Sequence, residues 1–287
     1  MRYPMPAAPL SRREFMMVSG TATALAILGA SSKIVRPLAC RQASYGKFAD
    51  AMWDHLPSIG VRHVFINVPE PDQAEAVRSK LQTHALIPLV MRGGADLSDA
   101  SCIEALTTQI DTCAKMGVRY MFLSPKHANA PKEKAIEHLK HVGDIAMAKN
   151  VIVSLETHPD LGTNGDVHAQ TMAAINHPNV RVNFDTGNIT YYNNGCNAVD
   201  ELKKCIQYVA TVEVKDHNGE LESWTFPPLG KGIVDFKGVI GVLNEHGYAG
   251  PVTLEFEGTK GIELDEQGTK QAIADSVAYL RSIGTFD

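Results

Sequence analysis

The chain has 287 residues, of which 44% are hydrophobic and 21% are charged, and its formal net charge is −5. This composition is typical of a globular protein, and the acidic balance argues against nucleic-acid binding, which needs a basic surface. Beyond the N-terminal segment no run of eighteen or more apolar residues occurs, so the sequence predicts no membrane span in the body of the chain.

The N-terminal segment, SRREFMMVSGTATALAILGASS, begins with Arg12 and Arg13 and continues into a mildly apolar stretch rich in small residues. This order is typical of a twin-arginine export signal, which we predict over residues 1–32 with cleavage near Ala30 or Ser32. The alternative is a tail that contains Arg-Arg by chance. Export would place the protein in the periplasm. The five cysteines form no CxxC pair, and we expect buried free thiols.

The body of the chain alternates between short apolar runs and amphipathic stretches. The predicted strands cover residues 34–39, 62–68, 85–90, 119–123, 151–156, 180–185, 209–214 and 251–256. The predicted helices cover residues 45–58, 71–82, 99–116, 131–149, 166–175, 198–207, 235–246 and 266–283.

This strict alternation predicts one domain, a closed (β/α)8 TIM barrel over residues 33–287. An open, doubly wound sheet is the alternative, but no G-x-G-x-x-G motif follows any predicted strand. The longest irregular segment covers residues 217–233, and loops of that length are often functional.

Four acidic residues stand at the ends of the last four predicted strands: Glu156, Asp185, Glu213 and Glu255. The C-terminal ends of barrel strands meet at one face, so these carboxylates are expected to lie close together. A divalent cation is the simplest way to stabilise such a cluster, and oxygen ligands suit Mg²⁺, Mn²⁺ or Ca²⁺ better than zinc.

The segments SLETH, NFDTGN, VEVKD, PPLGKGIVDF and GYAGPVTLEFEG make the family resemblance specific. Over roughly residues 33–283 the chain resembles the sugar phosphate isomerase/epimerase branch of the xylose isomerase-like barrel superfamily. The resemblance implies a divalent metal, Mn²⁺ or Mg²⁺, held by Glu156, Asp185, Glu255 and the residue at position 213. It also implies that Glu156 and Glu255 are the acid–base pair that moves a proton beside a carbonyl.

Two positions depart from the family pattern. Glu213 stands where a histidine is usual, which either hardens the metal preference or weakens metal binding, and His217 could supply a nitrogen from the following loop. Asn188 stands where the family often has a histidine, so it bears on substrate specificity.

Other polar residues near the strand ends are candidate substrate contacts: His158, Lys215, Asn188, Lys126 and His217. Each also has a structural interpretation. The rim residues can simply be solvated, the glutamates and Asp185 can cap the turns that follow them, and Glu213 can pair with Lys215.

The sequence therefore predicts an exported, metal-dependent enzyme that isomerises or epimerises a small-molecule sugar or polyol by proton transfer. The alternatives are a keto-glycoside lyase or hydrolase at the same site, and a non-catalytic sugar-binding barrel. No nucleic acid and no stable membrane span are expected. The particular sugar, the stereocentre, the metal and any oligomeric assembly stay open.

Overall fold

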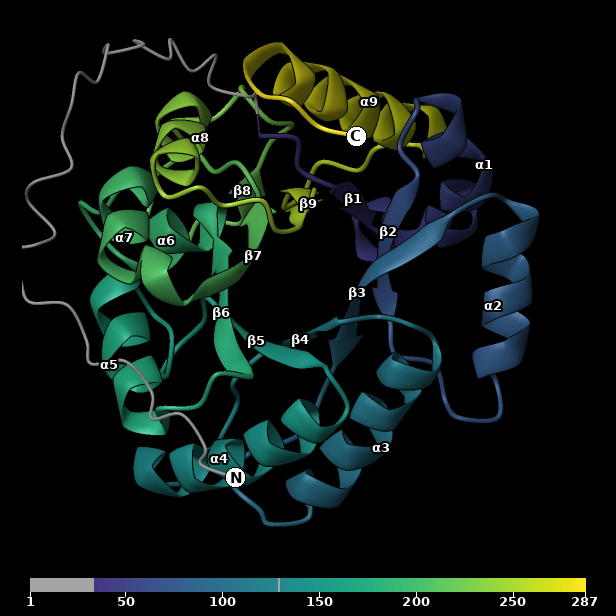
Figure 1. Ribbon diagram of the computed structural model, residues 1–287. Coiled ribbons are helices and arrows are strands. Elements are labelled where there is room, and N and C mark those ends of the chain that lie inside the picture. The colour runs from purple at the N-terminus through teal and green to yellow at the C-terminus, as the bar shows by residue number, and fades with distance from the viewer. Residues whose placement is uncertain (1–33, 129) are drawn as a thin grey trace, which may run out of the picture. The chain divides into compact units, whose positions relative to one another are not determined.

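The computed structural model describes residues 34–128 and 130–287. The predicted export signal lies outside these residues. Eight parallel strands close into a barrel in which each strand pairs with the next along the chain, and the last pairs with the first (Figure 1). They are β1 (Leu38–Arg41), β2 (His63–Asn67), β3 (Ile87–Gly93), β4 (Tyr120–Leu123), β5 (Ile152–Glu156), β6 (Val180–Asp185), β7 (Val209–Val214) and β9 (Val252–Leu254).

Helices form a ring outside the strands (Figure 1). They are η2 (Gln42–Ala51), α1 (Met52–Ser58), α2 (Ala74–Thr83), α3 (Cys102–Lys115), α4 (Lys132–Ala148), α5 (Gly165–Ile175), α6 (Thr186–Tyr192), α7 (Ala198–Cys205), η3 (Ile206–Tyr208), α8 (Phe236–Glu245) and α9 (Glu266–Ile283). The predicted (β/α)8 barrel is confirmed, and the open-sheet alternative is wrong because β1 pairs with both β2 and β9.

The two-residue period of the strands decides which side chains enter the barrel. On β6, Val182 and Phe184 belong to the main hydrophobic core. The alternate residues Asn183 and Asp185 face the barrel interior, where the Thr211 hydroxyl of β7 donates to the Asn183 side chain at 2.6 Å. Parallel pairing then sets Asp185 directly beside Glu213. Register and alternation together deliver the acidic side chains to the inside of one barrel end.

Two features differ from the predicted elements. The sequence pattern predicts the next helix after the sixth strand only at residues 198–207, yet α6 begins at once because Asp185 caps it, accepting from the amides of Gly187 and Asn188 at 2.9 Å each. A second, two-stranded antiparallel sheet joins β8 (Thr225–Phe226) to β10 (Gly258–Thr259). The long segment after β7 is therefore partly ordered by strand pairing.

The first and last described residues meet at the base of the barrel, opposite the strand ends that carry the acids. The amide of Arg36 donates to Thr285 at 3.1 Å, and the amide of Asp287 donates back to Arg36 at 3.2 Å. The first strand begins at Leu38 and not at residue 34, and Pro37, which has no amide hydrogen to donate, directly precedes it.

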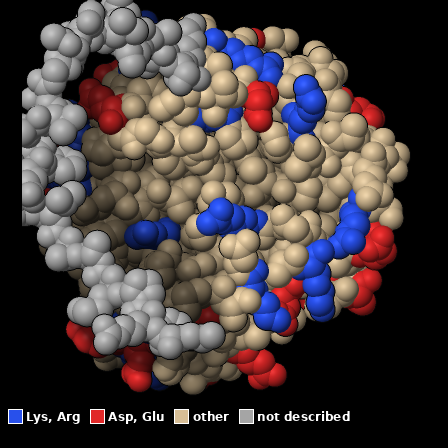
Figure 2. Space-filling model, viewed as in Figure 1, with Lys and Arg blue, Asp and Glu red and all other residues tan. Residues whose placement is uncertain are grey.

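The five cysteines are free, as predicted, with Cys196 partly exposed and the other four buried. In residues 34–128 and 130–287, no helix combines the length and apolar character that crossing a membrane requires. On the face shown in Figure 2, acidic and basic side chains are interspersed around the edge and most of the middle is uncharged. That face offers no broad basic area of the kind that nucleic acids need.

Candidate active site

The four predicted acids come together at the C-terminal ends of the strands. Glu156 and Glu255 are 8% and 5% exposed, and Asp185 and Glu213 are fully buried. Single carboxylate oxygens of Glu156, Asp185 and Glu213 all lie within 4.8 Å of one another. Glu255 follows β9 by one residue, and its amide donates to Val214 at 3.1 Å, so it continues the barrel pairing.

A buried arginine at the end of β1 enters this cluster. Arg41 Nη1 lies 3.3 Å from Glu213 Oε1 and also forms an ion pair with Glu255. Its guanidinium sits 4.9 Å from the Phe65 ring and 5.0 Å from the Phe122 ring. Both contacts favour a planar, weakly hydrated cation, since aromatic faces attract positive charge. Sequence reasoning missed Arg41, because the predicted first strand ended at residue 39.

Lys215 is the second buried cation, and its predicted closeness to the acids is seen. Its Nζ lies 2.8 Å from Glu255 Oε2, 3.2 Å from Asp185 Oδ2 and 3.2 Å from Glu257 Oε2. The suggested pairing of Lys215 with Glu213 is absent from the ion pairs of the described residues, where Arg41 takes that place. Glu257 is a fifth acid that sequence reasoning missed. The alternation Glu255–Phe256–Glu257 could have indicated it, because residues two apart along an extended strand point to the same side.

Five carboxylates therefore face two buried cations, and the excess negative charge appears in the pKa values. Burial raises the pKa of Asp185 to about 7, with Lys215 opposing and Glu255 adding to the rise. Burial and then Glu255 raise the pKa of Glu213 well above its usual range. Burial alone would also raise the pKa of Glu255, but Lys215 and Arg41 outweigh it and lower that pKa. Glu255 is thus the member held ionised.

The oxygens of this cluster fit a divalent cation. Asp185 Oδ1 accepts two amide hydrogen bonds, whereas Oδ2 is buried and accepts none, although Lys215 Nζ lies 3.2 Å from it. Glu156 and Glu213 bring further oxygens to the same point, and oxygen-only donors suit Mg²⁺, Mn²⁺ or Ca²⁺. Glu255 stands apart from this three-acid group, because its two oxygens are held by Arg41 and Lys215.

Neutral side chains orient the acids. The hydroxyl of Ser124 donates to Glu156 Oε2. Asn188 Nδ2 donates to the Thr157 carbonyl at 2.9 Å and to Glu156 Oε1 at 3.4 Å. The amide nitrogen of Asn188, expected to contact substrate, is therefore used inside the protein to hold the segment around Glu156.

The remaining predicted residues lie in different surroundings. His217 Nδ1 is 2.8 Å from the Thr190 hydroxyl and Nε2 is 2.9 Å from the Ser223 carbonyl, so both nitrogens have protein partners. This geometry leaves His217 no free nitrogen for a metal. His158 is partly exposed, and its Nδ1 lies 2.7 Å from the Pro159 carbonyl, which leaves Nε2 as the acceptor. Lys126 is exposed on the loop after β4.

The segment after β7 is anchored by Asp216. Its side chain accepts from the amides of Gly230, Gly232 and Val234 at 2.9, 2.8 and 3.2 Å. A Cβ on Gly232 would come within 2.3 Å of the Asp216 side chain and of the His217 carbonyl, so only glycine fits there. The motif VEVKD thus supplies Glu213 and Lys215 to the acid cluster and Asp216 to the loop that follows β7.

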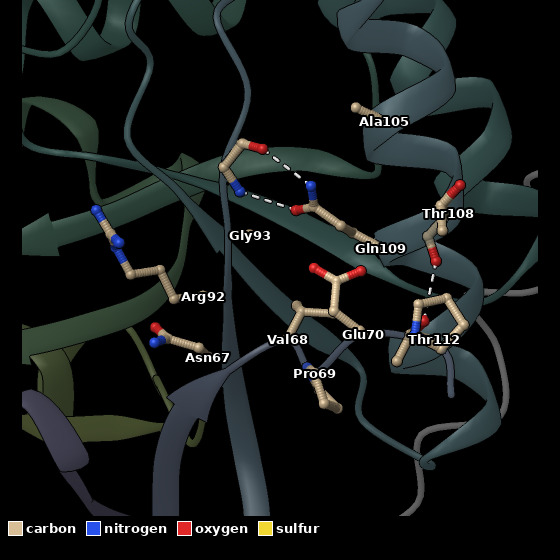
Figure 3. Close-up of a pocket in the computed structure, with 12 residues that line it drawn as sticks. Asn67, Val68, Pro69, Glu70, Arg92, Gly93, Ala105, Thr108, Gln109 and Thr112 are labelled. Atoms are coloured by element: carbon tan, nitrogen blue, oxygen red, sulfur yellow. Dashed lines mark hydrogen bonds between the residues drawn. The ribbon is translucent and has the colours of Figure 1, made fainter. Parts of the chain in front are cut away.

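Two cavities lie near the C-terminal ends of barrel strands, and the second of them is lined in part by Glu257 of the cluster. One of about 380 Å³ is lined by Asn67, Glu70, Arg92 and Gln109, and in Figure 3 the Arg92 side chain extends away from Gln109, which binds the Gly94 backbone. The other, also about 380 Å³, is lined by Tyr45, Trp224, Phe256 and Glu257. Glu257 connects this second cavity to Lys215. Both volumes fall in the range of small-ligand sites.

Curated relatives match parts of the chain. L-ribulose-5-phosphate 3-epimerase of Shigella flexneri is 26% identical over 182 residues, covering 61% of this chain and 62% of the relative. Inosose dehydratase of Glaesserella parasuis is 25% identical over 142 residues, covering 44% of this chain and 47% of the relative. The chain thus spans about half to three fifths of the length of these relatives.

Solved structures share the fold over most of the chain. The IolI protein with a bound zinc atom superposes with a TM-score of 0.69 at 19% identity, covering 86% of this chain and 98% of that one. D-psicose 3-epimerase in the presence of D-fructose superposes with a TM-score of 0.70 at 12% identity, covering 86% of this chain and 99% of that one. A xylose isomerase-like TIM barrel protein of Mycobacterium smegmatis in complex with magnesium superposes with a TM-score of 0.67 at 16% identity, covering 86% of this chain and 96% of that one.

A family model describes most of the barrel. The model for the xylose isomerase-like TIM barrel matches residues 51–283, which include Glu156, Asp185, Glu213 and Glu255. The matched stretch begins inside η2 and runs to the last residue of α9. The chain therefore belongs to the xylose isomerase-like TIM barrel family.

Proposed function

We propose that this protein is a divalent-metal-dependent sugar isomerase or epimerase that transfers a proton at the carbon beside a carbonyl. The observation that carries the proposal is the buried three-acid group of Glu156, Asp185 and Glu213, whose oxygens converge within 4.8 Å. The similarity to a sugar epimerase and to metal-binding barrels supports the same reaction class. The proposed substrate is a small sugar or polyol, and Mn²⁺ or Mg²⁺ is the proposed cation.

In this proposal Glu156, Asp185 and Glu213 hold the cation. When bound, the cation supplies positive charge at the substrate carbonyl oxygen, which acidifies the neighbouring carbon. The same charge would favour ionisation of Asp185 and Glu213, whose pKa values are raised by burial.

The proton steps fall to Glu156 and Glu255. Glu255 is ionised because Lys215 and Arg41 lower its pKa, so it is ready to accept a proton. Glu156 lies on β5, separated from β9 by β6 and β7 around the barrel. In this proposal the two carboxylates act from different sides of the substrate. Proton removal on one side and return on the other would invert a stereocentre.

Substrate positioning is the proposed role of the neighbouring polar groups. Lys215 and the free Nε2 of His158 are the groups best placed to meet hydroxyls, and Lys126 could contact a longer substrate at the rim. Asn188 would act on substrate through Glu156, and His217 through the loop that it anchors.

Proton exchange tests this function directly. Ketoses such as D-fructose are incubated in D₂O with the purified barrel and Mn²⁺, and deuterium at the carbon beside the carbonyl is measured by NMR. Exchange in the wild type that disappears in Glu255→Gln is expected. Wild-type protein that binds Mn²⁺ but exchanges no proton from any ketose or inosose tested would refute the proposal.

Elimination is the second candidate, because the relatives include inosose dehydratases. Elimination, including the lyase reaction of a keto-glycoside, begins with the same proton removal and then expels a leaving group. Product analysis separates the two, since an unsaturated product appears only in elimination. A sugar-binding barrel without catalysis is favoured instead if ligand binds and neither exchange nor turnover follows.

We further propose that residues 1–32 direct export by the twin-arginine pathway to the periplasm, on the strength of Arg12, Arg13 and the apolar residues after them. A reporter fused to residues 1–40 tests this. Export of the fusion, and its retention when both arginines become lysine, is the expected result.

A further inference from the structure

The cation-binding oxygen of Asp185 is already in contact with a positive charge. Asp185 Oδ1 accepts from the amides of Gly187 and Asn188 at 2.9 Å each, which commits that oxygen to capping α6. Only Oδ2 is left for a metal ion. Lys215 Nζ lies 3.2 Å from this oxygen.

The ammonium of Lys215 is held firmly in place. The residue is 3% exposed, and Nζ also lies 2.8 Å from Glu255 Oε2 and 4.7 Å from the centre of the Phe226 ring. Burial alone would lower the pKa of Lys215, but Asp185, Glu255 and Glu257 outweigh it and raise that pKa. The ion pairs with Asp185, Glu255 and Glu257 therefore hold the amine beside Asp185 Oδ2.

We propose that Lys215 is an internal competitor of the divalent cation, which occupies Asp185 Oδ2 in the metal-free protein and must leave it before a metal ion binds there. Two positive charges within hydrogen-bonding distance of one oxygen repel each other strongly in a buried site. Lys215 therefore weakens metal binding, and metal entry is coupled to movement of its side chain.

Glu257 gives Lys215 a place to move to. Its Oε2 lies 3.2 Å from Nζ, and its side chain is 26% exposed toward the cavity lined by Tyr45 and Trp224. Lys215 can thus release Asp185 and keep a carboxylate partner nearer to that cavity, so that it gains access to substrate when the metal binds.

The inference rests on the proposed metal site. It is tested by measuring Mn²⁺ binding to the purified full-length protein by isothermal titration calorimetry. Lys215→Met is expected to bind Mn²⁺ at least tenfold more tightly than wild type. Lys203→Met is the matched control, because it removes a lysine that is 54% exposed on α7, and its affinity should equal that of the wild type. Unchanged or weaker binding in Lys215→Met would overturn the inference.

These outcomes separate the two proposals. If the wild type exchanges substrate protons and Lys215→Met binds Mn²⁺ with the same affinity as the wild type, only the proposed competition is refuted. The wild type could instead bind no Mn²⁺ and exchange no substrate proton while Lys215→Met does bind Mn²⁺. That result would refute the proposed function and support the competition between Lys215 and the metal ion.

A measurement on the wild-type protein covers the case in which Lys215→Met does not fold. Amine labelling with a small reagent, quantified at Lys215 by peptide mass spectrometry, should increase several-fold on adding saturating Mn²⁺. If the extent of labelling at Lys215 is the same with and without Mn²⁺, the proposed displacement of its side chain is contradicted.

Discussion

Replacing Arg41 with methionine should expose how much the acid cluster depends on this cation. Arg41 is 8% exposed, pairs with Glu213 and Glu255, and lies against the adjoining rings of Phe65 and Phe122. Methionine preserves the apolar contact with both rings, so the change chiefly removes the charge. Breaking a buried ion pair by removing one partner typically costs about 3–5 kcal/mol, because the other charge is left buried without compensation.

For a domain of this size, 1 kcal/mol corresponds to about 2–4 °C in the melting temperature. Arg41→Met should therefore lower Tm by about 6–20 °C, measured by calorimetry in EDTA. The double variant Arg41→Met/Glu213→Gln should recover part of the loss, since it also removes one uncompensated carboxylate, and a double-mutant cycle gives the coupling directly. A Tm change below about 2 °C in the single variant would refute the view that Arg41 neutralises the cluster.

Three further outcomes are expected. Free Mn²⁺ at a hundred times its Kd should add about 2.7 kcal/mol to the free energy of unfolding, and no stabilisation at any concentration would contradict the metal site. Burial lowers the pKa of His168 from 6.5 to about 3, so its contribution to stability is complete above pH 6.5. That contribution falls by about 1.4 kcal/mol per unit as pH decreases toward 3, and urea unfolding should show a flatter acid slope for His168→Gln. Asp216→Ala should free the 217–233 loop, so limited proteolysis should cut there while circular dichroism stays unchanged; equal resistance would show that the anchor is dispensable.

The barrel and its acid cluster were predictable because they follow from short-range regularities. A period of two along VRVNFD sets Asp185 on the interior face, and the family motifs mark Glu156 and Glu255 as its neighbours. Arg41 was not predictable, because its acidic partners lie 172 and 214 residues away along the chain and no local pattern connects them.

Lys215 and α6 show a second limit of sequence reasoning. Alternation correctly brought Lys215 toward the acids, but which carboxylates it meets depends on how the chain leaves β7. The residues Asp185–Asn188 also fit a tight turn, and only the structure shows that Asp185 caps a helix of seven residues. Local propensity does not separate a turn from a short helix whose first amides are capped.

The pairing of the first and last described residues has a consequence for engineering this barrel. Arg36 exchanges backbone hydrogen bonds with Thr285 and Asp287, so a short linker is enough to join the ends of the folded domain. A circular permutant with new termini in the exposed turn around Gly195 would keep every barrel strand intact. Because that linker is short, a large fusion partner is best attached to the new termini and not near Arg36 at the base of the barrel.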